Sequence, residues 1–197
     1  MERAIKKKLS RFPIKDSEQR LWEIDQTILD RGVAVDETLT KNAILFHQTH
    51  KEEYAIHMRT MTQLENVNSV AQLKQWVQKR TGAQIKSLDK KAVKKLLQES
   101  KDDVLQEVLR VRAELSKTSV AKYEAAIRSV CQDKRARGIL QFYGANRTGR
   151  WAGRILQVQN LPQNHLADLA LARELVREGN YDLFEMLFPV PQTLSEF

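Results

Sequence analysis

The stretch from Tyr143 to Pro162 holds the residue types best suited to contact with another molecule. Its twenty residues contain three arginines, three glycines and a closing Gln157-Val-Gln159-Asn160 run, without one carboxylate. Arginine offers a planar fork for phosphates and for acceptor atoms on base edges. Gln and Asn amides both donate and accept, as recognition in a DNA minor groove requires. These residues indicate a nucleic-acid contact. The alternative is a glycine-rich hairpin whose arginines pair with acids elsewhere in the chain.

The charge of the chain is concentrated around this stretch. The 197 residues carry 33 Lys and Arg against 25 Asp and Glu, a net charge of +8. Residues 72–163 alone hold 20 basic and 8 acidic residues, a net charge of +12. Such a concentration favours a polyanion partner, most often nucleic acid. The alternative is a solvated lysine-rich surface. For the lysines at positions 90, 91, 94 and 95 of one predicted helix, the two alternatives are a DNA-facing ridge and a solvated face.

Composition excludes several other classes of protein. A hydrophobic fraction of 42% supports a packed core. The single cysteine, Cys131, excludes an intramolecular disulfide framework and a multi-cysteine zinc site, and we expect it to be an ordinary thiol. No apolar run reaches the ~20 residues of a membrane helix, and none follows the basic N-terminus as in a secretory signal. We therefore expect a cytoplasmic location and no membrane partner.

Hydrophobic spacing predicts a succession of helices as far as Arg137. Ser69 and Asp89 are expected N-caps, because each is a short polar residue directly before a periodic apolar run. A helix is expected to start at Thr38 or Thr40 and to end near Asn66. The other predicted helices cover residues 17–31, 70–80, 90–99, 104–115, 120–130 and 166–178.

The pattern changes after Arg137. The apolar, glycine-bounded run 138–144 predicts a strand, and the alternation over 154–159 predicts a second one. The expected fold class is therefore mainly α. We expect long antiparallel helices, a small helical tip and two or three short β-strands.

Several motifs in this order resemble family A DNA polymerases, and most closely their phage and prophage branch. Thr148-Gly149-Arg150, followed after eight residues by Gln159-Asn160-Leu161-Pro162, resembles the T-G-R…Q-N-[IL]-P signature of that family. The segments 17–36, 68–73 and 115–123 are similar to the entry into the polymerase region, to the start of a thumb helix and to the thumb tip. Together these motifs span about residues 17–162.

The resemblance implies a division of the chain into four parts. Residues 1–16 would be the tail end of a missing exonuclease-like domain, and 17–137 a thumb-like helical subdomain. Residues 138–163 would form partial palm strands with the T-G-R…Q-N-L-P motif. The acidic part, 164–197, would be a helical insertion of the phage branch, truncated before the first catalytic carboxylate motif.

The resemblance also implies which residues bind primer–template DNA. In the thumb, Lys117, Ser119 and Lys122 would contact the duplex backbone. Arg150 would reach the minor groove near the primer terminus, and the closing Gln–Asn pair would contact the duplex beside the active site. The full expected set is Lys117, Ser119, Lys122, Arg147, Thr148, Arg150, Arg154, Gln159 and Asn160.

The catalytic motifs of the family do not occur in these 197 residues. Family A polymerases carry metal-binding carboxylates in D-[YF]-S-x-[IL]-E and H-D-E motifs, and a nucleotide-binding R-x-x-x-K-x-x-x-[FY]-G helix. None is present here. Phosphoryl transfer of this kind requires metal ions held by carboxylates. We therefore expect no catalytic residue, no metal ligand and no cofactor in this chain, and Mg²⁺ only in the full-length polymerase.

The expected function is thus a primer–template-binding fragment of a DNA-directed DNA polymerase that is not catalytic alone. One alternative is a stand-alone, non-catalytic DNA-binding or accessory protein derived from a polymerase thumb. Another is one half of a split polymerase, whose partner is the remaining polymerase fragment. A more distant alternative is a helical interaction module without a nucleic-acid role.

Two weaker signals remain. His47, His50 and His57 lie on one predicted helix with Glu53 nearby, but packing or surface roles are favoured over metal binding because strong partners at fixed spacing are lacking. Trp151 replaces an aliphatic residue of the more familiar motif. It is expected either to pack inside the palm or to form a platform facing DNA.

Overall fold

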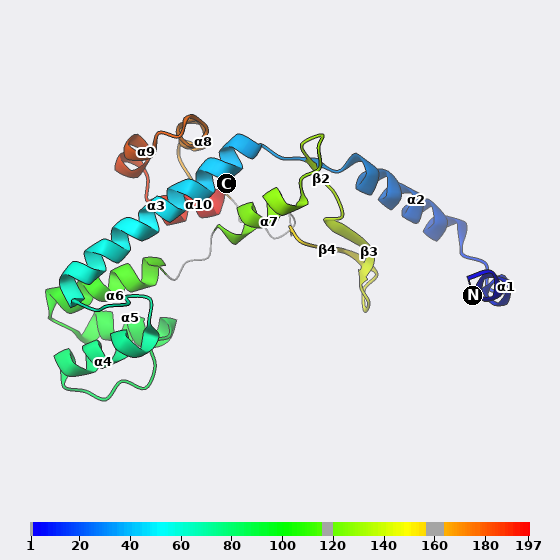
Figure 1. The fold of residues 1–197 in the computed structure, drawn as a ribbon. Coiled ribbons are helices and arrows are strands. Elements are labelled where there is room, and N and C mark those ends of the chain that lie inside the picture. Colours follow the sequence, from blue (N-terminus) through cyan, green and yellow to red (C-terminus); the bar gives the residue numbers. More distant parts are fainter. Residues whose placement is uncertain (1, 116–119, 157–163) are drawn as a thin grey trace. The chain divides into compact units, whose positions relative to one another are not determined.

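The computed structural model describes residues 2–115, 120–156 and 164–197 (Figure 1). They are mainly helical with a few short antiparallel strands, as predicted. The helices are α1 (Glu2–Leu9), α2 (Asp16–Arg31), α3 (Glu37–Thr62), α4 (Val70–Thr81), α5 (Lys90–Glu99), α6 (Asp103–Leu115), α7 (Ala121–Ser129), α8 (Leu169–Glu178), α9 (Tyr181–Leu187) and α10 (Val190–Glu196). The strands are β1 (Val33–Ala34), β2 (Arg135–Ala136), β3 (Leu140–Ala145) and β4 (Arg150–Gly153).

The chain forms two compact units, each built from two separate stretches. Unit 1 comprises Met1–Thr40 and Glu124–Leu161, and unit 2 comprises Lys41–Tyr123 and Pro162–Phe197. Helices α3 and α7 contribute residues to both units.

The predicted helix starts at Ser69 and Asp89 are confirmed. The Ser69 hydroxyl accepts from the Gln72 N–H at 3.4 Å, and α4 begins at the next residue. The Asp89 carboxylate accepts from the N–H groups of Lys91 and Ala92, both at 2.9 Å. These side chains satisfy backbone donors that have no partner within the first turn of a helix.

The second predicted strand, over 154–159, is wrong in its described part. The partner of β3 is β4, which ends at Gly153, and Arg154–Leu156 lie outside any strand. The tight turn after Ala145 returns the chain at once, so antiparallel pairing starts at Arg150. At Ile155 the backbone has a φ of 53°, which ends the extended conformation.

Unit 1 also contains a strand pair that the sequence does not predict. Strands β1 and β2 pair antiparallel, although about a hundred residues separate them. Arg135 donates to the carbonyl oxygens of Arg31 and Gly32, and Arg137 donates to that of Asp30. The two guanidinium groups thereby satisfy carbonyl groups at the C-terminal end of α2, where a positive charge is favourable.

A buried carboxylate joins the β3–β4 hairpin to α2. Asp25 is 2% exposed, and its Oδ1 accepts from the indole N–H of Trp151 at 2.7 Å. The Trp151 ring also packs edge-on against Phe142 of β3, with a centroid distance of 5.4 Å. Trp151 is therefore a packing residue of unit 1.

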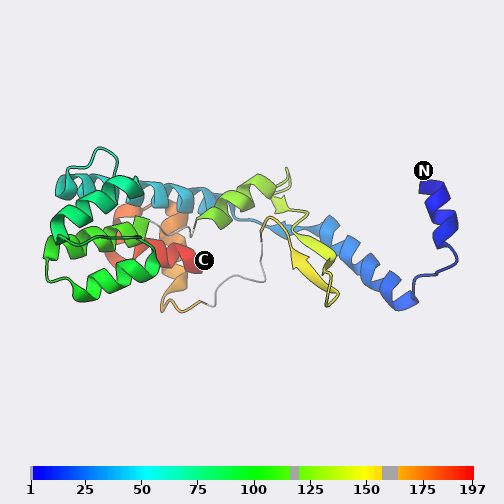
Figure 2. The ribbon, with the colours of Figure 1, turned by 90° about the horizontal axis from the view of Figure 1, so that it is seen from below.

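Helices α4, α5 and α6 pack against the C-terminal half of α3 to form the helical tip of unit 2 (Figure 2). Each contributes a buried apolar face, and Val93 is the buried residue of α5. The core consists of Met58, Val67, Leu73, Val77, Val93, Leu105, Val108, Leu109 and Val111.

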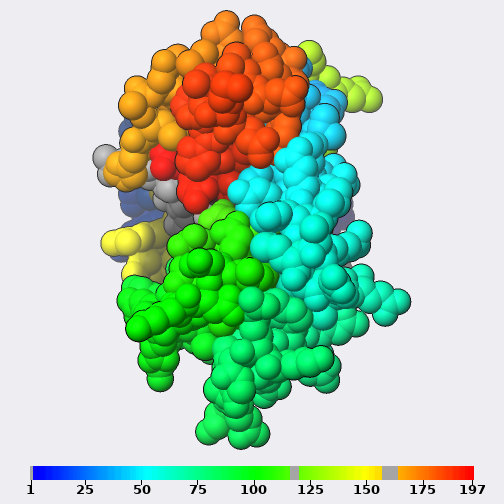
Figure 3. Space-filling model, turned by 90° about the vertical axis from the view of Figure 1, so that its left-hand side faces the viewer, coloured from blue at the N-terminus to red at the C-terminus, as the bar shows by residue number. Residues whose placement is uncertain are grey.

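Helices α8, α9 and α10 pack on the N-terminal half of α3, and Figure 3 shows their orange and red surface beside the cyan surface of α3. Phe46 of α3 and Phe184 of α9 are both fully buried, with ring centroids 5.3 Å apart. The Asn42 side-chain amide donates to the carbonyl oxygens of Val176 and Arg177, at the end of α8. An apolar contact and a side-chain cap therefore fix this acidic segment on α3.

Two adjacent residues of α7 contact α10 within unit 2. The Tyr123 hydroxyl donates to the Leu194 carbonyl oxygen at 2.6 Å, and burial raises the pKa of this tyrosine. Lys122 donates to backbone oxygens of Ser195 and Phe197 at 2.6 and 3.2 Å. Burial lowers the pKa of the Lys122 ammonium to about 8.

The Trp151–Asp25 hydrogen bond is expected to stabilise the fold of unit 1. Trp151→Phe keeps an aromatic ring but removes the indole donor, which leaves a buried carboxylate oxygen without that partner. We expect the free energy of unfolding to fall by about 1–3 kcal/mol in urea denaturation. Trp22→Phe is the matched control, because Trp22 is 46% exposed, and we expect it to cost less than about 0.5 kcal/mol. Equal losses in both variants would contradict this role of Asp25.

The lowered pKa of Lys122 predicts that the stability of the protein depends on pH. An unfolded lysine has a pKa of about 10.4, so between about pH 8 and pH 10 the unfolded chain binds more protons at this site than the folded chain. The free energy of unfolding should therefore rise with pH over this window in the wild type. Lys122→Met should lack that rise, since methionine does not titrate. Urea denaturation of both proteins across the window measures the difference, and parallel pH profiles would refute the effect.

Candidate nucleic-acid interface

The arginine-bearing motif folds as the tight end of the β3–β4 hairpin. The N–H groups of Thr148 and Gly149 both donate to the Ala145 carbonyl oxygen, at 3.0 and 2.9 Å. Gly149 has a φ of +66°, a conformation that favours glycine. The antiparallel pairing then starts with Ala145 opposite Arg150.

A bulge in β3 sets the geometry beside this turn. Between Gln141 and Ala145 the pairing register shifts, and Tyr143 has a φ of 52°. The Tyr143 ring lies so close to Gly149 that a Cβ there would be 2.8 Å from the ring. The turn therefore packs against an aromatic side chain, and this close approach requires glycine.

The three arginines of the hairpin have no protein partner among the described residues. Arg147, Arg150 and Arg154 are exposed, and their guanidinium groups make no hydrogen bond or ion pair with residues 2–115, 120–156 or 164–197. Thr148 is exposed as well. Within the described chain, the arginines do not pair with acids as the hairpin alternative required.

The structure separates these arginines from those with a structural role. Arg137 forms a two-pronged hydrogen bond with Asp133, at 2.8 and 2.7 Å. This contact lowers the pKa of the Asp133 carboxyl to about 2. Arg135 and Arg137 join the two stretches of unit 1 by bonding to carbonyl oxygens at the end of α2. The hairpin arginines remain available for an external anion.

The strand alternation places Arg150 away from α2. Successive side chains of a strand point to opposite faces, and Trp151 uses its face to reach Asp25. Arg150 therefore projects from the face that α2 does not cover.

The remaining predicted contacts are distributed differently. Lys117, Ser119, Gln159 and Asn160 lie outside the described residues. Lys122 is partly buried and its ammonium bonds to α10, so a contact with DNA would require this group to exchange partners.

Helix α5 of unit 2 presents a separate basic surface. Its apolar residues, including the buried Val93, face the core of the helical tip. Its four lysines at positions 90, 91, 94 and 95 are exposed. Lys95 faces Glu99 at 3.7 Å, an exposed pair that contributes little. This surface is compatible with both alternatives, a DNA-facing ridge or a solvated face.

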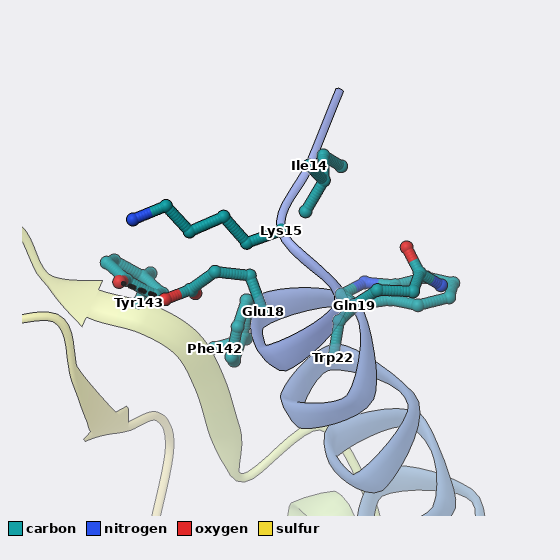
Figure 4. A pocket seen from close by; sticks show the side chains of 7 residues that line it. All are labelled: Ile14, Lys15, Glu18, Gln19, Trp22, Phe142 and Tyr143. Atoms are coloured by element: carbon teal, nitrogen blue, oxygen red, sulfur yellow. Dashed lines mark hydrogen bonds between the residues drawn. The ribbon is translucent and has the colours of Figure 1, made fainter. Parts of the chain in front are cut away.

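Unit 1 contains a groove between the start of α2 and strand β3 (Figure 4). It has a volume of about 740 Å³ and aromatic walls from Trp22, Phe142 and Tyr143. The Tyr143 hydroxyl donates to Glu18 at 3.3 Å, and the charge of Glu18 raises the pKa of this tyrosine. No pattern in the sequence indicates this groove, because only the tertiary contact brings the two elements together.

Unit 2 contains a group of side chains that could hold a cation. His50, Glu53 and Glu185 place one ligand atom each within 4.8 Å of one another. The other two histidines of α3 lie elsewhere: His57 faces Glu107 at 3.6 Å, and His47 is buried. Glu185 follows its partners by more than a hundred residues, so no spacing in the sequence indicates it.

None of the helices described in residues 2–115, 120–156 and 164–197 combines the length and apolar character needed to cross a bilayer.

Comparison with known proteins identifies a relative that matches the whole chain. No protein-family model matches it. All 197 residues align with a protein of Bacillus phage SP02 named DNA polymerase, with 47% identity. The chain spans 30% of the length of that protein. A sequence identity of 47% along the whole chain indicates common descent. The chain is therefore homologous to a segment of a phage DNA polymerase.

Proposed function

We propose that this chain is the primer–template-binding segment of a family A DNA polymerase and that it acts in DNA replication. The observation that carries the proposal is that the hairpin arginines, in and beside the T-G-R…Q-N-L-P motif, have no partner among the described residues. The 47% identity with a phage DNA polymerase supports the same assignment. In this proposal residues 17–137 form the thumb, which includes the helical tip of unit 2, and the hairpin forms the first strands of the palm.

The chemistry of the hairpin suits duplex DNA of any sequence. In the minor groove, A·T and T·A pairs present the same acceptors, so an arginine there holds a base pair with little regard to sequence. Lysines and arginines on phosphates add affinity that falls as salt rises. A polymerase needs this kind of grip, because it must move along every template. Arg150 is proposed to reach the minor groove, and Arg147, Thr148 and Arg154 to contact the adjacent backbone.

An exposed apolar face favours a segment of a larger enzyme over a stand-alone binder. Leu21, Ile24 and Ile28 follow one another at helical spacing on α2 and are 38%, 45% and 40% exposed. A soluble protein seldom leaves such a stripe uncovered unless another surface packs on it. We propose that the remaining part of the polymerase covers this face and supplies the carboxylates that hold Mg²⁺.

Arginine substitutions test the proposed DNA contact. Arg150→Ala should weaken binding of a primer–template duplex by about 1–3 kcal/mol, since it removes a base-edge contact. The triple substitution Arg147→Ala, Arg150→Ala and Arg154→Ala should also reduce the slope of log K against log salt by about 0.9 for each phosphate that the protein no longer neutralises. Fluorescence anisotropy with labelled duplexes at several salt concentrations measures both quantities.

Arg110→Ala is the matched control for this experiment. It removes the same charge, but Arg110 is paired on the protein with Glu107 at 3.7 Å and with Gln106 at 3.3 Å. The affinity of this variant should stay close to that of the wild type. An equal loss in the Arg110 and Arg150 variants, or an affinity that does not change with salt, would refute the proposed role of the hairpin.

The same proposal predicts binding without catalysis. With primed template, deoxynucleotides and Mg²⁺, the 197-residue chain should bind the duplex but leave the primer unextended, because these residues lack the carboxylate motifs for the metal ions. Gel analysis of the primer gives the result, and the DNA-binding measurement on the same sample separates an inactive protein from an unfolded one. Robust extension by the wild-type chain would contradict the proposal.

A further inference from the structure

Helices α3 and α9 of unit 2 bring an imidazole and two carboxylates together. His50 and Glu53 lie one turn apart on α3, so their side chains share a face. Glu185 approaches them from α9. One nitrogen of the histidine and one oxygen of each glutamate all lie within 4.8 Å of one another.

His50 is buried without a hydrogen-bond partner in the described part of the chain. It is 5% exposed, and neither ring nitrogen forms a hydrogen bond with a described residue. Nδ1 lies 3.7 Å from Oε1 of Glu185, which is too long for a hydrogen bond. The Tyr54 ring packs against the imidazole, with a centroid distance of 4.1 Å. A buried polar group without a partner is costly, and a ligand between His50 and Glu185 would relieve that cost.

Tyr181 holds the two carboxylates close together. Its hydroxyl lies 2.6 Å from Oε2 of Glu53 and 3.2 Å from Oε1 of Glu185. One hydroxyl has one proton, so it can donate to only one of the two carboxylates at a time. In the described part of the chain, two acidic side chains therefore converge beside His50, and the Tyr181 hydroxyl lies between them. Such convergence is unfavourable unless a positive charge joins the group.

We propose that His50, Glu53 and Glu185 bind a divalent transition-metal ion, with Zn²⁺ as the preferred ion. One imidazole nitrogen and two carboxylate oxygens are ligands that zinc accepts. Mg²⁺ and Ca²⁺ prefer oxygen ligands alone, so they should bind more weakly. Zinc–ligand distances are about 2.0–2.2 Å. Both glutamates are exposed and can rotate toward a common centre.

The proposed ion would fasten the C-terminal helices of unit 2 to α3. Glu185 follows Glu53 by 132 positions in the sequence, so a shared ion would close a long loop. The site lies in unit 2, whereas the arginine hairpin lies in unit 1. The inference is therefore independent of the proposed DNA contact, and it assigns a stabilising role to the acidic segment.

Metal binding by the full 197-residue chain tests the proposal. After treatment with a chelator and its removal, the folded protein should bind one equivalent of Co²⁺, with visible absorption that Zn²⁺ abolishes by competition and that Mg²⁺ and Ca²⁺ leave unchanged. Zn²⁺ should raise the thermal unfolding temperature, and a chelator should reverse the rise. Glu53→Gln and Glu185→Gln should each weaken binding at least about tenfold, the scale seen even for outer-sphere partners of a metal site.

Two variants of the same helix serve as controls. Glu52→Gln removes an exposed carboxylate adjacent to Glu53, and His57→Ala removes the exposed histidine of α3. Both should bind metal as the wild type does. Circular dichroism of each variant shows whether it is folded, which is expected because all four substituted side chains are exposed. Absence of saturable Co²⁺ and Zn²⁺ binding by the wild type would overturn the proposal. Equal binding by the Glu52 and Glu185 variants would also overturn it.

Discussion

The carboxylate of Asp25 lies inside unit 1, where a negative charge is costly unless hydrogen-bond donors reach it. The indole N–H of Trp151 is such a donor, and its position fixes the hairpin on α2. Because strand side chains alternate, this contact also directs Arg150 to the opposite face. The presentation of the arginine motif thus depends on a hydrogen bond to a buried carboxylate, between segments that lie 126 positions apart in the sequence.

The arginines of unit 1 fall into two groups by their contacts. Arg135 and Arg137 bond to carbonyl groups at the end of α2, so their charges serve the fold. The hairpin arginines make no such contact with described residues. Net charge alone does not separate these groups, because every arginine counts equally in it. Within a broad basic region, the geometry therefore selects one short hairpin as the candidate for the proposed DNA contact.

Helix α3 organises unit 2 along its length. Its C-terminal half packs against the helical tip, and its N-terminal half receives the acidic helices α8–α10 through Phe46 and Asn42. The same docking brings Glu185 to His50 and Glu53. An acidic segment to which the sequence assigns no role thereby gains two physical roles: it covers an apolar face of α3, and it completes the proposed cation site.

The sequence by itself determined the local structure and the motif. Helical periodicity, the caps at Ser69 and Asp89 and the mainly helical fold class follow from neighbouring residues, and the structure confirms them. The T-G-R…Q-N-L-P residues were also visible without a structure. The second strand was misplaced, because its position depends on where the turn at Gly149 returns the chain. Only tertiary structure decided that Trp151 packs on Asp25, that Lys122 bonds to α10, and that Glu185 meets His50. Each of these contacts joins residues more than seventy positions apart, and local spacing carries no record of which distant surfaces meet when the core is buried.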